Sequence, residues 1–280
     1  MRLVFLISVT MVAFASNSVL NRMAVDGGWI TPLQFAGIRV LAGAVMLLML
    51  VRLQARAVPM SGWIRAVGAT SLAIYMLGFS LAYTTLDAGL GALILFGVVQ
   101  ITMFCATAMG GTAVSARQVS GAAIAFAGLA WVLWPGKAGL AAPAGAVSMA
   151  LAGVGWAAYS LAGRREPDAL AATAANFLLC LPLVAVPLVV LGWETAPGLI
   201  GIALAVLSGA VTSGLGYALW YRVLPQIPAT SAATVQLSVP VIAILAGAAL
   251  LAEPLSWRLI VAAGVVLGGI ALAIRKPQAV

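Results

Sequence analysis

Charged residues and histidine are what this sequence has least of. Only 7% of its 280 residues are Asp, Glu, Lys or Arg, and there is no histidine. A soluble domain carries about 25% charged residues, so this composition cannot cover a water-soluble surface. The missing histidine excludes Ser-His-Asp and Cys-His nucleophilic sites and removes the commonest zinc ligand. We therefore expect no catalytic residues, no metal site and no cofactor.

Cysteine is also scarce. The two cysteines, Cys105 and Cys180, lie inside apolar runs without C-x-x-C spacing, so we interpret them as packing residues.

The few acidic residues all lie at the ends of apolar runs or between them. They are Asp26, Asp87, Glu166, Asp168, Glu194 and Glu253. For a transporter, this distribution would favour facilitated diffusion, with proton-coupled efflux as the alternative, because proton-driven transporters place a titratable group along the pathway. The sequence has no Walker-type phosphate loop, which argues against ATP-driven pumping by this chain.

Long apolar stretches are what the sequence has in abundance, since 64% of its residues are hydrophobic. A helix needs about 20 apolar residues to cross about 30 Å of hydrocarbon. Ten such runs occur, at residues 3–20, 31–51, 64–84, 88–109, 119–134, 145–161, 170–191, 199–220, 229–251 and 259–274. They lack the alternation of a β-barrel. The sequence therefore predicts an all-α membrane protein with ten transmembrane helices.

The first run allows two interpretations. Arg2, the apolar stretch and Ala13-Phe14-Ala15 followed by Ser16 resemble a cleavable signal peptide. We favour a first transmembrane helix instead, because the run continues past the supposed cleavage site and because the repeat described below requires it.

Basic residues are distributed unevenly between the two sides of the predicted bundle. With the N-terminus in the cytoplasm, the cytoplasmic segments hold Arg2, Arg52, Arg56, Arg65, Arg117, Arg164, Arg165, Arg222, Arg275 and Lys276. The opposite side holds only Arg22, Lys137 and Arg258, and Arg39 lies within a run. The positive-inside rule then predicts two cytoplasmic termini. The same scatter of the +8 net charge argues against nucleic-acid binding, because no basic cluster accompanies a polar pattern.

The two halves of the chain resemble each other. Residues 79–86 (FSLAYTTL) run parallel to residues 217–224 (YALWYRVL), at an offset of about 140 residues. We therefore predict two repeats of five helices, residues 1–136 and 143–276. Because five is odd, the second repeat is inverted relative to the first. Inverted repeats are typical of secondary transporters, which hold their substrate near the bilayer midplane.

Several short motifs occur in a fixed order along the chain. Residues 32–39 (PLQFAGIR) open the second run, residues 250–256 (LLAEPLS) follow Pro240 in the ninth, and the last run carries glycines. In this order and spacing they resemble the EamA-type ten-helix branch of the drug/metabolite transporter superfamily. The likeness covers nearly the whole chain. It implies export of amino acids or other small metabolites across a bacterial inner membrane.

Two details refine this resemblance. Residues 156–159 (WAAY) and the aromatic-rich eighth run are similar to exporters of aromatic amino acids. The family often has an acidic residue near the end of the fourth span, matching Glu253 in the second half. This sequence reads MGGTA at residues 109–113 instead, which puts a paired carboxylate in doubt.

Polar side chains deep in a span are costly unless they face protein or a water-filled cavity. The candidate substrate-binding amides are Asn17, Asn21, Gln100, Asn176 and Gln236. An amide suits both the ammonium and the carboxylate of a zwitterion. The alternative role for each is a hydrogen bond that holds two helices together.

Aromatic residues supply the second group of candidates. By helical spacing, Tyr75 and Phe79 share a face of the third helix, Trp156 and Tyr159 lie close on the sixth, and Tyr217 lies on the eighth. Such a wall binds apolar or aromatic bodies.

Arg39 and three prolines are candidates for structural or gating roles. Arg39 has three possible roles: snorkelling to the interface, pairing with a substrate carboxylate or a helix end, or holding the fold; we favour the last. Pro182, Pro187 and Pro240 remove helix hydrogen bonds, so each is a candidate kink for gating or a static kink.

Small residues on two runs indicate close helix packing or a homodimer face. Gly264 and Gly268 form G-x-x-x-G on the last run, and Gly121 with Ala125 is the counterpart on the fifth.

Two competing functions fit less well. A membrane-embedded enzyme acting on lipids would gather His, Asp or Glu at the interface, and a scaffold has no need of inverted halves. We expect a small-molecule substrate and the lipid bilayer as partners.

Overall fold

The protein is described by a computed structural model over residues 1–110, 115–134, 143–164, 166–191, 195–227 and 235–274. These residues are helical and include no strand. The elements are α1 Arg2–Asp26, α2 Pro32–Leu53, α3 Trp63–Ala82, α4 Ala88–Met109, α5 Ala116–Leu133, α6 Pro143–Gly163, α7 Ala169–Leu191, α8 Leu199–Val206, η1 Leu207–Leu215, α9 Gly216–Val223, η2 Leu224–Gln226, α11 Ser238–Leu251 and α12 Trp257–Ile274.

Nine helices of the described residues are long and apolar enough to cross a membrane. One of them is the continuous segment Leu199–Gln226, in which α8, η1, α9 and η2 follow without a break. The tenth helix, α11, is apolar but has only 14 residues. This arrangement confirms the predicted class, an all-α membrane protein with ten helices. The first part of the ninth predicted run, residues 229–234, lies outside the described residues.

Helix starts follow local sequence signals. Thr31 accepts a hydrogen bond from the Gln34 backbone, while the Gln34 side chain accepts one from the Thr31 backbone, and Pro32 opens α2. Ser115 and Gln118 form the same capping box at the start of α5. Each box satisfies backbone N–H groups that the first turn leaves without partners.

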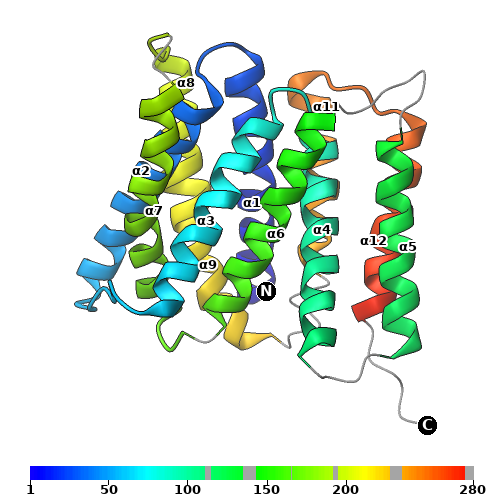
Figure 1. The fold of residues 1–280 in the computed structure, drawn as a ribbon, viewed down its shortest axis with the longest axis horizontal. Coiled ribbons are helices and arrows are strands. Elements are labelled where there is room, and N and C mark those ends of the chain that lie inside the picture. Colours follow the sequence, from blue (N-terminus) through cyan, green and yellow to red (C-terminus); the bar gives the residue numbers. More distant parts are fainter. Residues whose placement is uncertain (111–114, 135–142, 165, 192–194, 228–234, 275–280) are drawn as a thin grey trace.

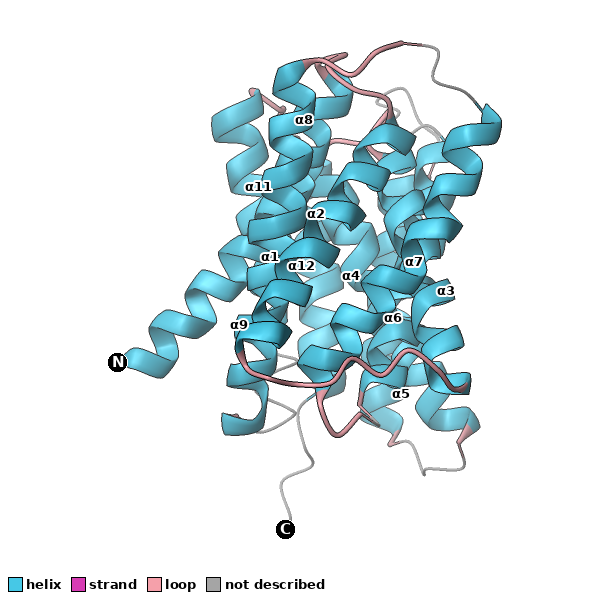
Figure 2. Ribbon diagram, turned by 90° about the vertical axis from the view of Figure 1, so that its left-hand side faces the viewer, coloured by secondary structure: helices cyan, strands magenta, loops and turns pink. Residues whose placement is uncertain are grey.

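The helices run side by side and their connections gather at two ends of the bundle (Figure 1). The connections 27–31, 83–87 and 252–256 lie at one end, which we call the sealed end; the connection 54–62 and residues 166–168 lie at the other, the open end. In Figures 1 and 2 α1 begins and α12 ends toward the open end.

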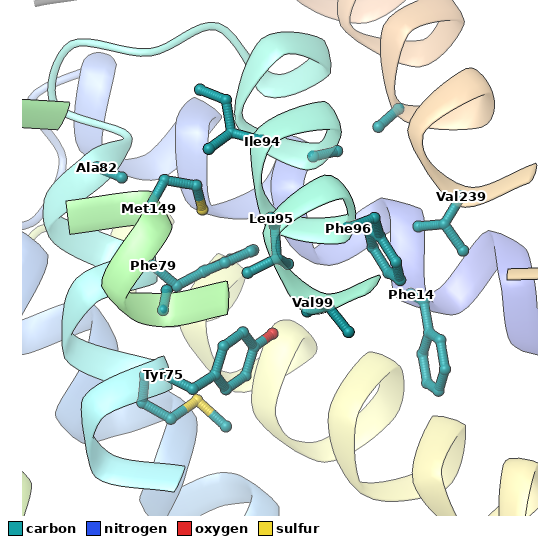
Figure 3. Packing of buried hydrophobic residues seen from close by; sticks show 14 of the residues in the cluster. Phe14, Tyr75, Phe79, Ala82, Ile94, Leu95, Phe96, Val99, Met149 and Val239 are labelled. Atoms are coloured by element: carbon teal, nitrogen blue, oxygen red, sulfur yellow. The ribbon is translucent and has the colours of Figure 1, made fainter. Parts of the chain in front are cut away.

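The core lies where α3, α4 and α6 meet. Figure 3 shows Tyr75 and Phe79 along α3, with Leu95 and Val99 of α4 close by and Met149 of α6 between the helices. All five side chains are at most 5% exposed. The outside of the bundle carries large exposed apolar side chains instead, such as Val45, Phe126 and Leu245. An apolar outer surface is what lipid tails solvate.

Glycines bring α5 and α12 into backbone contact at one edge of the bundle (Figure 1). A Cβ at Gly121 would lie 2.5 Å from the Gly269 carbonyl oxygen, and a Cβ at Gly269 would lie 2.7 Å from the Gly121 oxygen. The predicted pair Gly264 and Gly268 has no neighbour within 4 Å that such a Cβ would meet. The packing glycine of α12 is thus one position further along the chain.

The eighth span contains a π-helix, η1, of nine residues. π-Helices are rare and usually one turn long, and they occur frequently at functional sites. η1 packs closely against α2, where Gly209 faces the Arg39 carbonyl oxygen so tightly that a Cβ would overlap it. Glycine is therefore required where the two helices cross.

Candidate functional site

A cavity of about 1490 Å³ enters the bundle from the open end. Its walls come mainly from α4, α5, α6, α9 and α12, together with residues 166–170, 224–225 and 227. None of the connections at the sealed end contributes a lining residue. The described cavity therefore reaches one end of the bundle.

Two ion pairs stand at the mouth of the cavity. Arg56 bonds Asp168 at 2.9 Å, with both side chains partly exposed. The buried Arg65 pairs with Glu166 and donates from Nη1 to the Ala172 carbonyl and the Asn176 Oδ1, each at 2.9 Å. The predicted substrate residue Asn176 thus serves to tie α7 to α3.

The predicted aromatic residues come together as an aromatic layer, which we define as Tyr75, Phe79, Trp156, Tyr159 and Tyr217. Ring centroids are 5.0 Å apart for Tyr75 and Trp156, and 5.3 Å apart for Trp156 and Tyr217. Tyr75 also contacts Phe79 at 5.3 Å, and Trp156 stacks on Tyr159 at 5.4 Å. Only Trp156 and Tyr217 line the cavity. They present one aromatic surface to whatever occupies it.

Two of the predicted amides, Gln100 on α4 and Gln236 ahead of α11, line the cavity, while Asn17 and Asn21 on α1 do not. Asn21 donates from Nδ2 to the Ser80 hydroxyl at 2.9 Å. For these two asparagines the structure provides helix-to-helix hydrogen bonds.

Asn17 belongs to a buried polar cluster with η1. Its Oδ1 accepts hydrogen bonds from the hydroxyls of Ser208 at 2.8 Å, Thr212 at 2.7 Å and Ser213 at 3.3 Å. No local pattern predicts this cluster, because its hydroxyl donors come from a helix almost 200 residues away. The cluster satisfies polar groups that would otherwise be costly in the middle of a membrane.

Arg39 lies beside this cluster and is completely buried. Its Nε donates to the Ser213 hydroxyl at 3.2 Å and its Nη2 to the Tyr75 hydroxyl at 3.1 Å. The guanidinium also lies over the rings of Tyr75, at 5.4 Å, and Phe79, at 4.9 Å. Nη1 has no hydrogen-bond partner, and no carboxylate of the described residues pairs with this arginine.

The sealed end is closed by a charge cluster that sequence analysis did not assign to the site. Arg22 on α1 pairs with Asp26 at 3.0 Å and lies 3.7 Å from Asp87 and 3.8 Å from Glu253. Glu253 accepts a hydrogen bond from the Ala88 backbone N–H at 2.8 Å, at the first residue of α4. The i,i+4 spacing of Arg22 and Asp26 was the only local signal.

The two best-buried acids of this cluster have shifted pKa values. Burial raises the pKa of Glu253 above its ordinary value, against the lowering effect of the Ala88 N–H and Arg22. Burial likewise raises the pKa of Asp87, against the effect of Arg22. Both carboxyl groups therefore hold a proton more tightly than they would in water.

The prolines occupy different positions in their helices. Pro182 and Pro187 lie inside α7, which continues through both. Before Pro240 the helix is interrupted at Leu237 and resumes at Ser238, so that Pro240 lies in the first turn of α11. A proline in a first turn leaves no helix hydrogen bond unmade.

Comparisons with known proteins relate the chain to a transporter family. The chain is 45% identical over 273 residues to an uncharacterized protein of Pseudomonas aeruginosa, covering 97% of this chain and 94% of that protein. The model of the EamA-like transporter family matches residues 143–275. The second half of the chain is thus similar to the EamA-like transporter family. A segment is also 41% identical over 68 residues to an uncharacterized transporter of Archaeoglobus fulgidus, covering 24% of this chain and 25% of that protein.

The fold of this protein is shared with a solved crystal structure whose name states no function. The TM-score is 0.67 at 19% sequence identity, over 95% of this chain and 98% of that chain. The membrane-length helices and the match to a transporter family indicate a multi-pass membrane protein. The family match covers almost the same residues as the predicted second repeat, 143–276.

Proposed function

We propose that this protein exports amino acids or related small metabolites, with aromatic amino acids as the favoured class, across the bacterial inner membrane by alternating access. The observation that carries the proposal is the one-ended cavity, whose walls combine Trp156 and Tyr217 with the amides Gln100 and Gln236. An aromatic surface accommodates an apolar body, while amides hydrogen-bond polar groups. Binding sites are commonly apolar cavities with a few convergent polar groups.

The helix contacts support the predicted pair of inverted repeats. If each helix of the first half corresponds to the helix five places later, a two-fold arrangement requires contacts to occur in matched pairs. The contact of α3 with α6 has its counterpart in the contact of the eighth span, η1 and α9, with α1. The contact of α4 with α6 has its counterpart in the contact of α11 with α1. Three further close pairs each join two corresponding helices, so the two-fold operation maps each pair onto itself. These pairs are α2 with α7, α4 with α11 and α5 with α12.

The ends of this two-fold arrangement differ in charge, which supports a direction for the cavity. The open end carries Arg56, Arg164 and Arg222 along the cavity wall. By the positive-inside rule this end faces the cytoplasm, and both termini lie there. The protein then takes up its substrate from the cytoplasm, and the cluster of Arg22, Asp87 and Glu253 keeps the outer end shut.

Alternating access in this arrangement is a rocking of the two halves. Opening the outer end has to separate Glu253 from the first residue of α4, because Glu253 belongs to the second half and Ala88 to the first. Among the described residues no acidic side chain lies in the middle of a span. We therefore propose facilitated diffusion down the substrate gradient.

Proton-coupled efflux is the second candidate, because the buried carboxyl groups of Asp87 and Glu253 hold protons more tightly than in water. The two mechanisms differ in their response to a pH gradient. Facilitated diffusion proceeds without a pH gradient, and a pH gradient does not accelerate it. Strict dependence of uptake on a proton gradient would establish coupling instead.

The proposed function is tested by reconstituting the purified protein in liposomes and measuring uptake of radiolabelled amino acids, aromatic and aliphatic. Uptake above that of protein-free liposomes is expected for at least one amino acid. Absence of uptake for the whole panel, by protein shown to be folded, would overturn the proposal.

A further inference from the structure

The unmatched donor of Arg39 bears on the charge of the substrate. A buried cation needs a counter-charge or a full set of hydrogen bonds, and without them it is costly. Arg39 has two hydrogen bonds, to Ser213 and Tyr75, and lies over two aromatic rings, but its Nη1 has no partner. Cation–π contacts offset part of the cost of burial and leave the donor unsatisfied. The protein therefore holds a positive charge that its described residues do not neutralise.

The second group without a hydrogen-bond partner is a hydroxyl on the cavity wall. The Tyr217 hydroxyl is buried and has no hydrogen-bond partner, and Tyr217 lines the cavity. Its ring contacts Trp156, and the Trp156 ring contacts Tyr75, which accepts the hydrogen bond from Arg39. The charge of Arg39 also lies near enough to Tyr217 to interact with it electrostatically. Two unsatisfied groups able to donate hydrogen bonds are thus present: the Tyr217 hydroxyl on the cavity wall, and Nη1 of Arg39, which contacts the aromatic layer but does not line the cavity.

We propose that a carboxylate of the substrate binds between Arg39 and Tyr217, so that the transporter selects carboxylate-bearing molecules over amines of the same shape. This inference rests on the proposed function. A carboxylate has two oxygens and no proton to donate, so it can accept from the guanidinium and from the phenol together. Hydrogen bonds between an ionised donor and an ionised acceptor are the strong ones. Trp156, the other cavity-lining residue of the aromatic layer, contacts the apolar body.

The π-helix provides the movement that this binding needs. Arg39 does not itself line the cavity, so the aromatic layer has to part before a carboxylate reaches Nη1. η1 carries Ser213, the partner of Arg39, and continues directly into α9, which carries Tyr217. A shift of this segment moves Tyr217 relative to Arg39. π-Helices are often found at positions where function needs such a local irregularity.

A purely structural role for Arg39 predicts a different outcome. In that role the guanidinium only fixes η1 through Ser213, and its loss changes the transport of every compound by the same factor. In the proposed role its loss changes the preference between compounds. The test therefore compares three compounds with one aromatic body: L-tryptophan, indole-3-propionate, which lacks the ammonium group, and tryptamine, which lacks the carboxylate.

Uptake of the three compounds into proteoliposomes is measured for the wild type and for Arg39→Met, Arg39→Lys, Tyr217→Phe and Tyr159→Phe. The wild type is expected to take up both carboxylates with a kcat/KM about tenfold or more above that for tryptamine. Arg39→Met is expected to lose that preference, and Arg39→Lys to keep part of it. Tyr217→Phe weakens the carboxylates selectively. Tyr159→Phe is the matched control, because the Tyr159 hydroxyl already donates to Thr173, and it changes all three compounds by one factor.

Two results would overturn the inference while leaving the proposed function intact. One is tryptamine uptake by the wild type equal to that of the carboxylates, and the other is an unchanged preference in Arg39→Met. Absence of uptake of these compounds and of every amino acid in the panel overturns the proposed function itself. If Arg39→Met does not fold, the comparison of Tyr217→Phe with Tyr159→Phe decides. The carboxylate site is rejected if Tyr217→Phe, like Tyr159→Phe, changes the uptake of all three compounds by one factor.

Discussion

Removing the carboxylate of Glu253 is predicted to open the sealed end. The side chain is 10% exposed, its Oε1 accepts the Ala88 N–H at 2.8 Å, and it lies 3.8 Å from Arg22. The carboxylate therefore links the α11–α12 connection to the first turn of α4, where the helix dipole favours a negative charge. The perturbations are Glu253→Ala, which removes the acceptor, and Glu253→Gln, which keeps an oxygen acceptor without the charge.

The expected magnitude follows from these contacts. Loss of a side-chain cap costs about 0.5–2 kcal/mol. Because this contact exists only while the end is closed, Glu253→Ala should shift the equilibrium toward the outer-open state by about 0.5–2 kcal/mol. That is about a two- to 30-fold change in the population ratio. Glu253→Gln keeps an oxygen acceptor and removes a charge whose burial raises the pKa of Glu253, so it should not shift the ratio toward the outer-open state.

The assay measures access to a cysteine just inside the sealed end. Ser80 is buried two residues before the end of α3, and a Ser80→Cys variant is introduced with Cys105 and Cys180 changed to Ala. A membrane-impermeant maleimide added outside should label it faster in the Glu253→Ala background, by the factor given above. Asp26→Asn is the matched control, because Asp26 pairs with the same Arg22 but is 56% exposed. Equal labelling with and without Glu253, or an equal increase in Asp26→Asn, would refute the reasoning.

Four further predictions concern acidity, packing and the site. Burial raises the pKa of Glu253 in the closed state, so protonation of Glu253 favours closure of the sealed end. Closure is therefore favoured at a pH below the ordinary pKa of 4.5, and this preference is lost as the pH rises through the raised pKa. Labelling from outside should increase over that pH range, and Glu253→Gln should show no such increase. Gly121→Leu should lower the thermal midpoint by several degrees, because a Cβ at this position meets the α12 backbone. Gly264→Leu should leave the midpoint unchanged, because a Cβ at that position has no neighbour within 4 Å; equal shifts in both variants would contradict the described packing. Asn17→Leu leaves the Ser208 and Ser213 hydroxyls without their acceptor, whereas Thr212 keeps the Ser208 carbonyl, and it should destabilise the protein by about 1–3 kcal/mol in chemical denaturation; an unchanged midpoint would contradict this. Gln236→Leu should impair amino-acid uptake while leaving the melting temperature nearly intact, and normal uptake would remove Gln236 from the site.

The fold was largely predictable because lipid imposes a simple rule on composition. Ten runs were expected, and the fourth helix has the predicted bounds, Ala88–Met109. The first helix is longer than predicted, because Asn21 and Arg22 near its end are polar in sequence yet lie within the bundle. The π-helix was not predictable, since a change in hydrogen-bond register leaves no trace in hydropathy.

The candidate site was predictable only in part. Helical spacing correctly grouped the aromatic residues, because spacing within one helix fixes which side chains share a face. It could not tell cavity amides from structural ones. Gln236 lines the cavity whereas Asn17 and Asn176 bond to neighbouring helices, and that difference depends on which helix lies opposite. Whether these residues act in transport stays a prediction.

The charge cluster of the sealed end was missed for a similar reason. Arg22, Asp87 and Glu253 are far apart in the sequence and each lies at a helix end, where charged residues are expected to meet water. Their common position depends on two connections and one helix meeting at the same end of the bundle. Nothing in the local sequence of any one of them indicates the other two.

Paired labelling of the two ends tests the central claim most directly, which is that the cavity opens to one side at a time. Single cysteines at Ser160, on the cavity wall, and at Ser80, beneath the sealed end, are labelled in proteoliposomes from the side each faces, with and without a transported amino acid. We predict that substrate lowers the labelling rate at Ser160→Cys from the cytoplasmic side and raises it at Ser80→Cys from the outer side. Rates that change in the same direction, or that do not change at a saturating substrate concentration, would contradict it.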